Sequence, residues 1–190
     1  RATRYLHLQA ADAHDAAHHS DDAAVRGENQ AFLELMVPVV KGWSTENSID
    51  VASTGVQVHG GMGFIEETGA AQYYRDARIL TIYEGTTAIQ ANDLVGRKTA
   101  RDGGATARGI IAQVRATEVQ LEAAHGADFN AIRRRLSEGR AALETVVDYV
   151  AGNAKSDIKA VYAGRVPYLK LVGIVLGGWQ MGREVLMTRR

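Results

Sequence analysis

Residues 29–63, NQAFLELMVPVVKGWSTENSIDVASTGVQVHGGMG, hold the pattern from which the architecture can be worked out. Apolar residues recur there at helical spacing and predict a long helix over residues 29–59. Pro38 stands inside it and predicts a kink or an irregular turn. Three glycines among residues 60–63 allow left-handed backbone, so we expect the helix to end there.

The sequence on either side of this helix also reads as helical, because proline is scarce and no apolar–polar alternation runs for the length of a strand. We expect a polar turn at 19–27, a connector at 79–85 and a capping box from Thr87 to Gln90. Asp102-Gly103-Gly104 marks the predicted boundary between two all-α domains, residues 1–101 and 102–190. The other expected helices cover residues 1–18, 69–78, 86–101, 105–125, 129–154 and 166–190.

The sequence has a helical pattern at both of its ends, without the residues that usually start or stop a helix. No capping residue precedes the pattern that begins at Arg1, and no stop signal follows Gly182. We therefore expect the chain to be a piece of a longer protein, truncated at both ends.

Composition excludes several classes of function. Lysine plus arginine and aspartate plus glutamate total 22 each and are interspersed, which argues against a nucleic-acid surface or docking on anionic lipid. The chain has no cysteine, which excludes disulfides and thiolate chemistry and fits a cytoplasmic location. The most apolar run, residues 171–176, is too short to span a membrane, and no signal peptide is visible.

Two short patterns imitate ligand sites. His14 and His18 have zinc-protease spacing, but Asp15 replaces the expected glutamate and no third ligand follows, so we predict a solvated histidine face and no metal site. Gly60-Gly61-Met62-Gly63 could bring bare N–H groups to a phosphate. The alternative for this turn is a simple helix C-cap, and its spacing does not match a Rossmann fingerprint.

The segment Ile82-Tyr83-Glu84-Gly85-Thr86-Thr87 carries more chemistry. A carboxylate stands on a connector before a helix N-terminus, whose partial positive charge suits a phosphate or an oxyanion. A glutamate flanked by Ile82, Tyr83 and a glycine can be desolvated, so we expect these neighbours to suit Glu84 to the role of a general base. Desolvation raises the pKa of a carboxyl toward that of such a base. The alternative is that Glu84 only complements the helix dipole.

Three motifs follow one another: QVHGGMGFIEE (57–67), YRDARI (74–79) and IYEGTTAIQ (82–90). In this order and spacing they resemble the C-terminal signature of the acyl-CoA dehydrogenases. The resemblance implies that residues 1–101 form part of an antiparallel four-helix bundle. It also implies that residues 102–190 are the additional helical module of longer bacterial members, a group that includes the methylmercaptopropionyl-CoA dehydrogenases.

The resemblance also assigns roles. Glu84 would remove the α-proton of an acyl-CoA thioester while the β-hydrogen leaves as hydride to flavin N5, giving the trans-2-enoyl-CoA. The backbone N–H of Glu84 and a flavin ribityl hydroxyl would bind the thioester oxygen. Substrate-binding positions are Gly85, which leaves room for the thioester, and Tyr83. The positions implied for FAD are Gln57, His59, Gly60, Gly61, Thr86 and Ala88.

Within that set, Thr86 would contact the diphosphate, while Ala88 stands where relatives often carry a polar side chain. Gln57, Gly60 and Gly61 match a turn that reaches the FAD of a neighbouring subunit. The neighbouring Arg75 and Asp76 are expected to form an ion pair that positions the Glu84 loop.

The implied partners are an acyl-CoA substrate, an electron-transfer flavoprotein, and further copies of the chain in a homodimer or a higher homo-oligomer. The amino-terminal helical domain, the middle β domain and the early C-terminal helices of the family are absent, so we predict that these residues alone are inactive. Two alternatives stay open, namely an acyl-CoA oxidase on the same scaffold and a non-catalytic helical assembly module.

Overall fold

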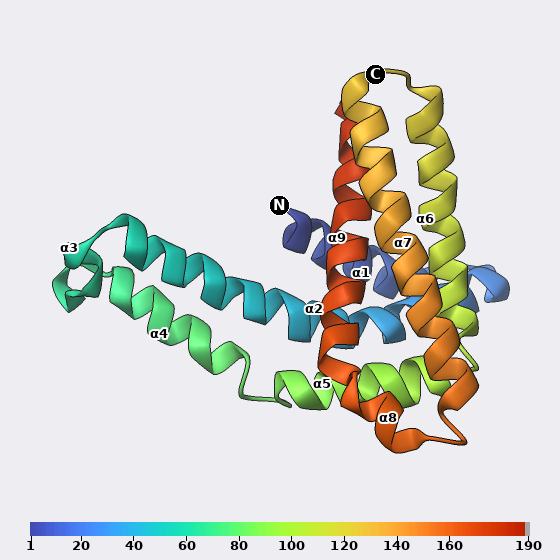
Figure 1. Ribbon diagram of the computed structural model, residues 1–190, viewed down its shortest axis with the longest axis horizontal. Helices are drawn as coiled ribbons and strands as arrows, with labels where there is room; N and C mark the ends of the chain where they lie inside the picture. Colours follow the sequence, from blue (N-terminus) through green and yellow to red (C-terminus); the bar gives the residue numbers. More distant parts are fainter. Residues whose placement is uncertain (189–190) are drawn as a thin grey trace.

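A computed structural model describes residues 1–188, and the chain is built from helices connected by short turns (Figure 1). No strand occurs within these residues, so the prediction of an all-α fold is confirmed. The last expected helix reaches Thr188, and positions 189–190 lie outside the described residues. The elements are α1 (Ala2–His19), α2 (Ala23–Val58), α3 (Gly61–Phe64), η1 (Glu66–Thr68), α4 (Ala70–Leu80), α5 (Thr87–Asp93), η2 (Leu94–Ala100), α6 (Ala105–Ala123), α7 (Ala127–Asn153), α8 (Ile158–Ala163) and α9 (Arg165–Thr188).

The long helix α2 begins six residues earlier than the sequence pattern indicated, so the predicted turn at 19–27 is wrong in its extent. The Asp22 side chain accepts the N–H of Ala24 at 2.8 Å and caps the new start. Arg26 closes the short turn by donating to the carbonyl of Ser20 at 2.7 Å. Gly27 is therefore inside a helix, at a cost of ~1 kcal/mol that the cap helps to offset.

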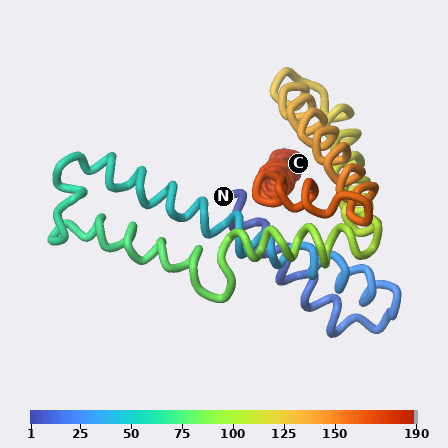
Figure 2. The backbone as a smooth tube through the Cα atoms, turned by 60° about the horizontal axis from the view of Figure 1, so that its bottom comes forward, coloured from blue at the N-terminus to red at the C-terminus, as the bar shows by residue number. Residues whose placement is uncertain are grey.

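The second half of α2 turns back through α3 and η1 into α4, and this hairpin projects from the rest of the molecule (Figures 1 and 2). We call residues 47–80 the arm. Its tip is closed by Gly63, where an added Cβ would lie 2.1 Å from the carbonyl oxygen of Val56. Only glycine allows this approach, so the tip folds tightly although most of the arm is exposed.

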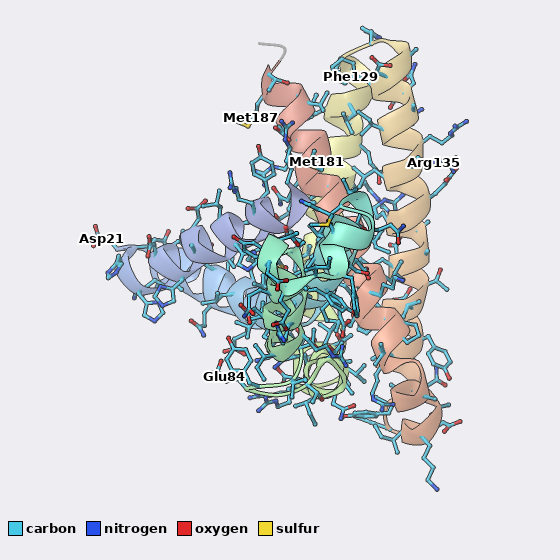
Figure 3. The ribbon with its side chains drawn as sticks, turned by 90° about the vertical axis from the view of Figure 1, so that its left-hand side faces the viewer. Asp21, Glu84, Phe129, Arg135, Met181 and Met187 are labelled. Carbon is cyan, nitrogen blue, oxygen red and sulfur yellow. The ribbon has the colours of Figure 1, made fainter. Side chains whose placement is uncertain are left out.

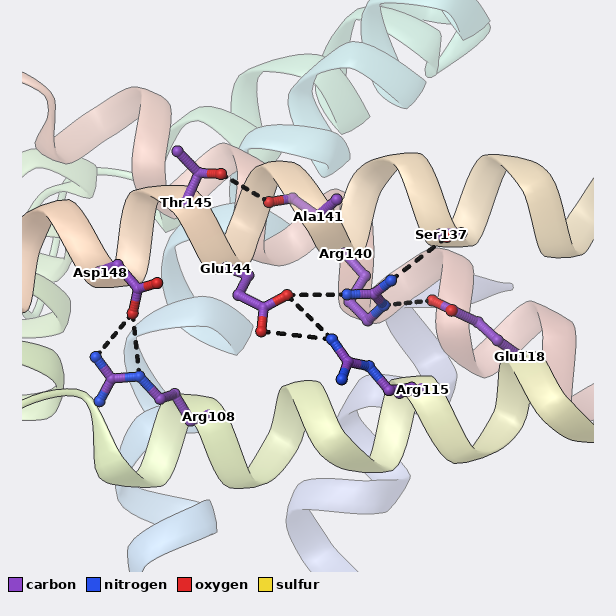
Figure 4. A network of polar contacts seen from close by, with 9 residues as sticks. All are labelled: Arg108, Arg115, Glu118, Ser137, Arg140, Ala141, Glu144, Thr145 and Asp148. Atoms are coloured by element: carbon purple, nitrogen blue, oxygen red, sulfur yellow. Dashed lines mark hydrogen bonds and ion pairs between the residues drawn. The ribbon is translucent and has the colours of Figure 1, made fainter.

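Helices α6, α7 and α9 pack side by side at the other end of the molecule, and we call them the bundle (Figure 1). Their apolar faces are covered within the chain, with Val114, Leu121 and Val147 fully buried. Ion pairs along α6 and α7 reinforce the contact (Figure 4).

The bundle and the earlier helices share a core. Helix α9 contacts α1, α2 and α5, and buried residues from both sides of the turn at 102–104 belong to one hydrophobic cluster. The turn itself lies where the sequence placed it, with Asp102 accepting the N–H groups of Gly104 and Thr106, each at 2.9 Å. The division into two domains at this turn stays a prediction.

Candidate functional site

The segment between α4 and α5 carries Glu84 on a tight turn at the surface (Figure 3). After α4 ends, the N–H groups of Ile82 and Tyr83 both bond to the carbonyl of Ile79, at 3.0 and 3.2 Å. Glu84 then takes a φ of 52° and Gly85 a φ of 92°, so two consecutive residues are left-handed. For glutamate this conformation costs ~1–2 kcal/mol, and such strain persists where other contacts hold it.

Lys41 of α2 holds this turn. Its Nζ donates to the carbonyl of Leu80 at 2.9 Å and to the carbonyl of Gly85 at 2.6 Å. The ammonium also lies 5.6 Å from the centre of the Tyr83 ring, within the range of a cation–π contact. No local sequence pattern marks Lys41 as part of the site, because its two acceptors lie 39 and 44 residues away.

The start of α5 differs from the predicted capping box. Thr86 is the N-cap residue and makes no side-chain capping bond, whereas Thr87 lies inside the helix. The Thr87 hydroxyl instead donates to Glu46 of α2 at 2.5 Å, and the Gln90 side chain donates to the carbonyl of Glu84 at 3.3 Å. The capping-box prediction is wrong because Thr87 bonds to α2 and Gln90 bonds to the preceding turn, so neither side chain caps α5.

The Glu84 side chain is exposed, and its neighbours Ile82 and Tyr83 are about half exposed. The prediction that these neighbours desolvate the carboxylate is therefore wrong for this chain, since Glu84 stays exposed beside them. Among the described residues, the backbone N–H of Glu84 has no hydrogen-bond acceptor. Both the carboxylate and the N–H are free to meet a ligand.

The second predicted site segment lies at the tip of the arm. Gln57, His59, Gly60 and Gly61 are all exposed, and an added Cβ on Gly61 would meet no atom within 4 Å. His59 Nδ1–H donates to the carbonyl of Gly55 at 2.8 Å, which fixes its ring against α2. The backbone of this turn is open to an approaching molecule.

The two predicted segments are not brought together. They flank opposite ends of α4, an 11-residue helix about 16 Å long at ~1.5 Å per residue. Tyr83, Gly85, Thr86 and Ala88 are close to Glu84 in sequence on the segment that follows α4, whereas the glycine turn precedes α4 at the tip of the arm.

The expected ion pair of Arg75 and Asp76 is a wrong prediction. Arg75 donates to Glu66 at 2.9 Å, and Asp76 accepts from Gln72 at 2.8 Å. These contacts lie within α4 and toward η1, because both side chains point along the exposed surface of the arm. They hold the tip of the arm and not the Glu84 turn.

His14 and His18 stack with ring centres 4.2 Å apart. No cluster of three metal-ligating side chains occurs among residues 1–188. Over the same residues, no helix combines the length and the hydropathy needed to cross a bilayer.

Two family descriptions match the chain. One, the C-terminal domain of acyl-CoA dehydrogenases, matches residues 1–99, and the other, acetyl-CoA dehydrogenase C-terminal like, matches residues 110–190. The 3-methylmercaptopropionyl-CoA dehydrogenase of Ruegeria pomeroyi is 54% identical over 172 residues, which are 90% of this chain and 29% of that protein.

Two further relatives carry related names. The broad-specificity linear acyl-CoA dehydrogenase FadE5 of Mycobacterium tuberculosis is 33% identical over 82% of this chain and 26% of that protein. Subunit CarC of the caffeyl-CoA reductase-Etf complex of Acetobacterium woodii is 40% identical over 36% of this chain and 18% of that protein. The chain thus spans less than a third of the length of these relatives. With the first family description covering residues 1–99 of 190, this chain belongs to the acyl-CoA dehydrogenase family.

Proposed function

We propose that the protein containing this chain is an FAD-dependent acyl-CoA dehydrogenase that converts an acyl-CoA thioester to the trans-2-enoyl-CoA, with Glu84 as the general base. The observation that carries the proposal is the left-handed Glu84–Gly85 turn. It presents a free carboxylate and a free backbone N–H on the same exposed loop. In this family such a pair of groups suits removal of the α-proton next to a carbonyl.

Each group on the turn has a task in this reaction. The Glu84 carboxylate takes the α-proton, and the Glu84 N–H donates to the thioester oxygen as charge develops there. Gly85 has no side chain beside the thioester, and Tyr83 lies next to the acyl group. Desolvation of the carboxylate is supplied by the substrate and by segments outside these residues, because the turn is exposed here.

The residues present fit parts of an FAD site. The N-cap Thr86 makes no side-chain capping bond, so its hydroxyl and the first N–H groups of α5 can meet the diphosphate beside Ala88. At the arm tip, the open backbone of Gly60 and Gly61, with Gln57 and His59 beside it, can meet the nucleotide half. FAD, when bound, supplies the acceptor for the hydride that leaves the β-carbon.

The separation of the two segments supports an assembly of several subunits. The glycine turn lies at the exposed tip of the arm, about 16 Å along α4 from the Glu84 turn, where a second subunit can approach it. We propose that the glycine turn completes the FAD site of a neighbouring subunit in a homodimer or a higher homo-oligomer. An electron-transfer flavoprotein would be the electron acceptor of the FAD-loaded protein, in a cytoplasmic setting that suits a chain without cysteine.

The two family matches support the proposed domains. Residues 1–101 would belong to the catalytic helical domain, and residues 102–190 would form the additional module. The lengths of the relatives support the proposal that the remaining FAD contacts lie in further segments, so that residues 1–190 alone do not turn over.

Replacing Glu84 by Gln in the full-length protein tests the base. The amide keeps the shape of the side chain but cannot take the proton, so flavin reduction by acyl-CoA should slow by roughly 10²-fold or more in stopped flow. FAD and substrate should still bind. Glu67→Gln, the same change on the exposed arm, is the matched control. A Glu84→Gln rate within about tenfold of wild type, ~1.4 kcal/mol in barrier, contradicts the assignment.

Mixed subunits test the shared site. Gly61→Asp places a carboxylate against the diphosphate, and Glu84→Gln removes the base. If a site takes Gly61 from one subunit and Glu84 from the other, a heterodimer has one intact site and regains activity. If each subunit completes its own site, every site carries one lesion and no activity returns.

Two measurements separate the alternatives. Peroxide formation by the full-length protein without an added acceptor would identify an oxidase, and a colourless protein without flavin would identify an assembly module. A screen of acyl-CoA chain lengths that includes 3-methylmercaptopropionyl-CoA would define the substrate.

A further inference from the structure

The Glu84 turn is fixed from a distant part of the chain. Lys41 bonds to the carbonyl groups of Leu80 and Gly85, which stand just before and at the end of the turn. These contacts join residues 39 and 44 positions apart, so they fix the turn relative to α2. An ammonium donates strongly to carbonyls, and both ends of the turn are held by one group.

The turn needs such a restraint. A left-handed glutamate costs ~1–2 kcal/mol, and a free loop would relax toward an ordinary conformation. The Gln90 side chain adds a second restraint by donating to the Glu84 carbonyl at 3.3 Å. We call Lys41 and Gln90 the clamp.

The two residues that follow Lys41 pack closely against α9 of the bundle. An added Cβ on Gly42 would lie 2.6 Å from Cδ2 of Leu169 and 3.4 Å from Cβ of Gln90. The Trp43 ring lies against Gly173, where an added Cβ would be 2.2 Å from Cγ of the indole. Both approaches depend on glycine, so α2 and α9 meet in close register at this point.

Three consecutive residues of α2 therefore connect the Glu84 turn to the bundle. Lys41 reaches the Glu84 turn, while Gly42 and Trp43 lie in the contact with α9. Helix α9 also packs on α5, which carries Gln90, so it contacts the supports of both halves of the clamp (Figure 1). A shift of α9 would move α2 and α5 relative to each other and change the clamp geometry.

We propose that the C-terminal bundle braces the Glu84 turn, with α9 pressing on α2 at Gly42 and Trp43 and so holding Lys41, a positioning residue, against the carbonyls of Leu80 and Gly85. The effect on the rate of flavin reduction rests on the proposed role of Glu84 as the base, whereas the effect on the structure of the turn does not. The bundle thereby contributes to the reaction through the position of Lys41.

Two glycines of α9 provide a matched pair of variants. Gly173→Ala forces the new methyl group into Trp43, whereas Gly178→Ala meets no atom within 4 Å on the same helix. In the full-length holoenzyme we expect Gly173→Ala to raise deuterium uptake in residues 80–86 and to slow flavin reduction about tenfold or more, because small misplacements of reacting groups are costly. Gly178→Ala should change neither measurement, and uptake in residues 105–153 should stay constant in both variants.

Lys41→Met tests the clamp without touching α9. It removes the ammonium but keeps an unbranched side chain, so uptake in residues 80–86 should rise and flavin reduction should slow while FAD stays bound. Lys41→Arg retains a charged donor and should recover part of both properties. A merely structural role would not give this rescue together with a local change in uptake.

The proposal is overturned if uptake in residues 80–86 stays at the wild-type level in Lys41→Met, or if Gly178→Ala matches Gly173→Ala. Uptake does not depend on the chemistry of Glu84. If Glu84→Gln keeps its activity while Lys41→Met loosens the turn, the base assignment fails and the brace stands.

Discussion

The bundle and the arm are both helical, but they differ in how far the chain covers its own apolar surface. In the bundle Leu121 is 0% exposed, whereas Phe64 at the tip of the arm is 83% exposed. The arm also exposes Val58 and Tyr73. Large exposed apolar patches mark contact surfaces, so the difference is consistent with the proposal that the arm meets a neighbouring subunit, whereas the bundle packs on itself and on α1, α2 and α5.

The two regions also use charge differently. On α6 and α7, Arg140 lies between Glu118 and Glu144, at 2.7 and 3.0 Å, with little of its side chain exposed (Figure 4). On the arm, Arg75 pairs with Glu66 in solvent, where an ion pair contributes ~0–1 kcal/mol. Internal contacts therefore stabilise the bundle far more than the arm.

The largest contrast is expected from truncating one apolar residue in each region. Leu121→Ala opens a cavity in the bundle and should lower the free energy of unfolding by roughly 3 kcal/mol. Phe64→Ala removes an exposed side chain and should change it by less than about 0.5 kcal/mol. Urea denaturation followed by circular dichroism measures both. Equal losses would mean that the arm packs as the bundle does.

A smaller contrast is expected from the arginines of α7. Arg140→Met leaves the Glu118 carboxylate, 11% exposed, without its ion-pair partner and should cost roughly 2 kcal/mol, less than for a fully buried pair. Arg135 is 74% exposed beside Glu138, so Arg135→Met should cost under about 0.5 kcal/mol. The same denaturation experiment measures both variants. If Arg140→Met does not change the free energy of unfolding, the attraction between Arg140 and Glu118 only offsets the cost of desolvating the two charges.

Helical periodicity was sufficient to place most of the helices, because the apolar stripe is a local property of the chain. It failed at Gly27, where a glycine that usually signals a turn is tolerated behind the Asp22 cap. The region around residues 102–104 was located from its glycines, since positive φ there demands that residue type.

The site was predictable where it rests on a motif and not where it rests on tertiary contacts. Glu84 and Gly85 were proposed as site residues from the IYEGTT pattern, whereas Lys41 bonds to a residue 44 positions away and leaves no local signal. The partner of Thr87 was missed for the same reason, whereas Arg75 was paired with Asp76 although its partner Glu66 lies only nine residues away. The exposure of Glu84 could also not be predicted from the sequence, because the burial of a turn depends on which helices pack over it.

The last prediction concerns Tyr168, at the joint where α9 of the bundle meets η2. Its hydroxyl donates to Oγ1 of Thr99 at 3.0 Å, because the Thr99 hydroxyl itself donates to the carbonyl of Leu94. Burial raises the pKa of Tyr168 from 10.0 to about 12. The folded state thus favours the neutral phenol.

A raised pKa contributes stability that is complete below pH 10 and is lost as the pH rises through about 12. The loss has an upper limit of ~2.7 kcal/mol at ~1.36 kcal/mol per pKa unit. Tyr168→Phe should cost about 1 kcal/mol at pH 7 through the lost hydrogen bond. Since phenylalanine does not titrate, the advantage of wild type over the variant should shrink between pH 10 and 12. Tyr149→Phe, at a half-exposed position of α7, is the control and should leave stability unchanged at neutral pH. A wild-type advantage that stays constant up to pH 12 would show that Tyr168 meets water, and that the joint between the bundle and η2 is open.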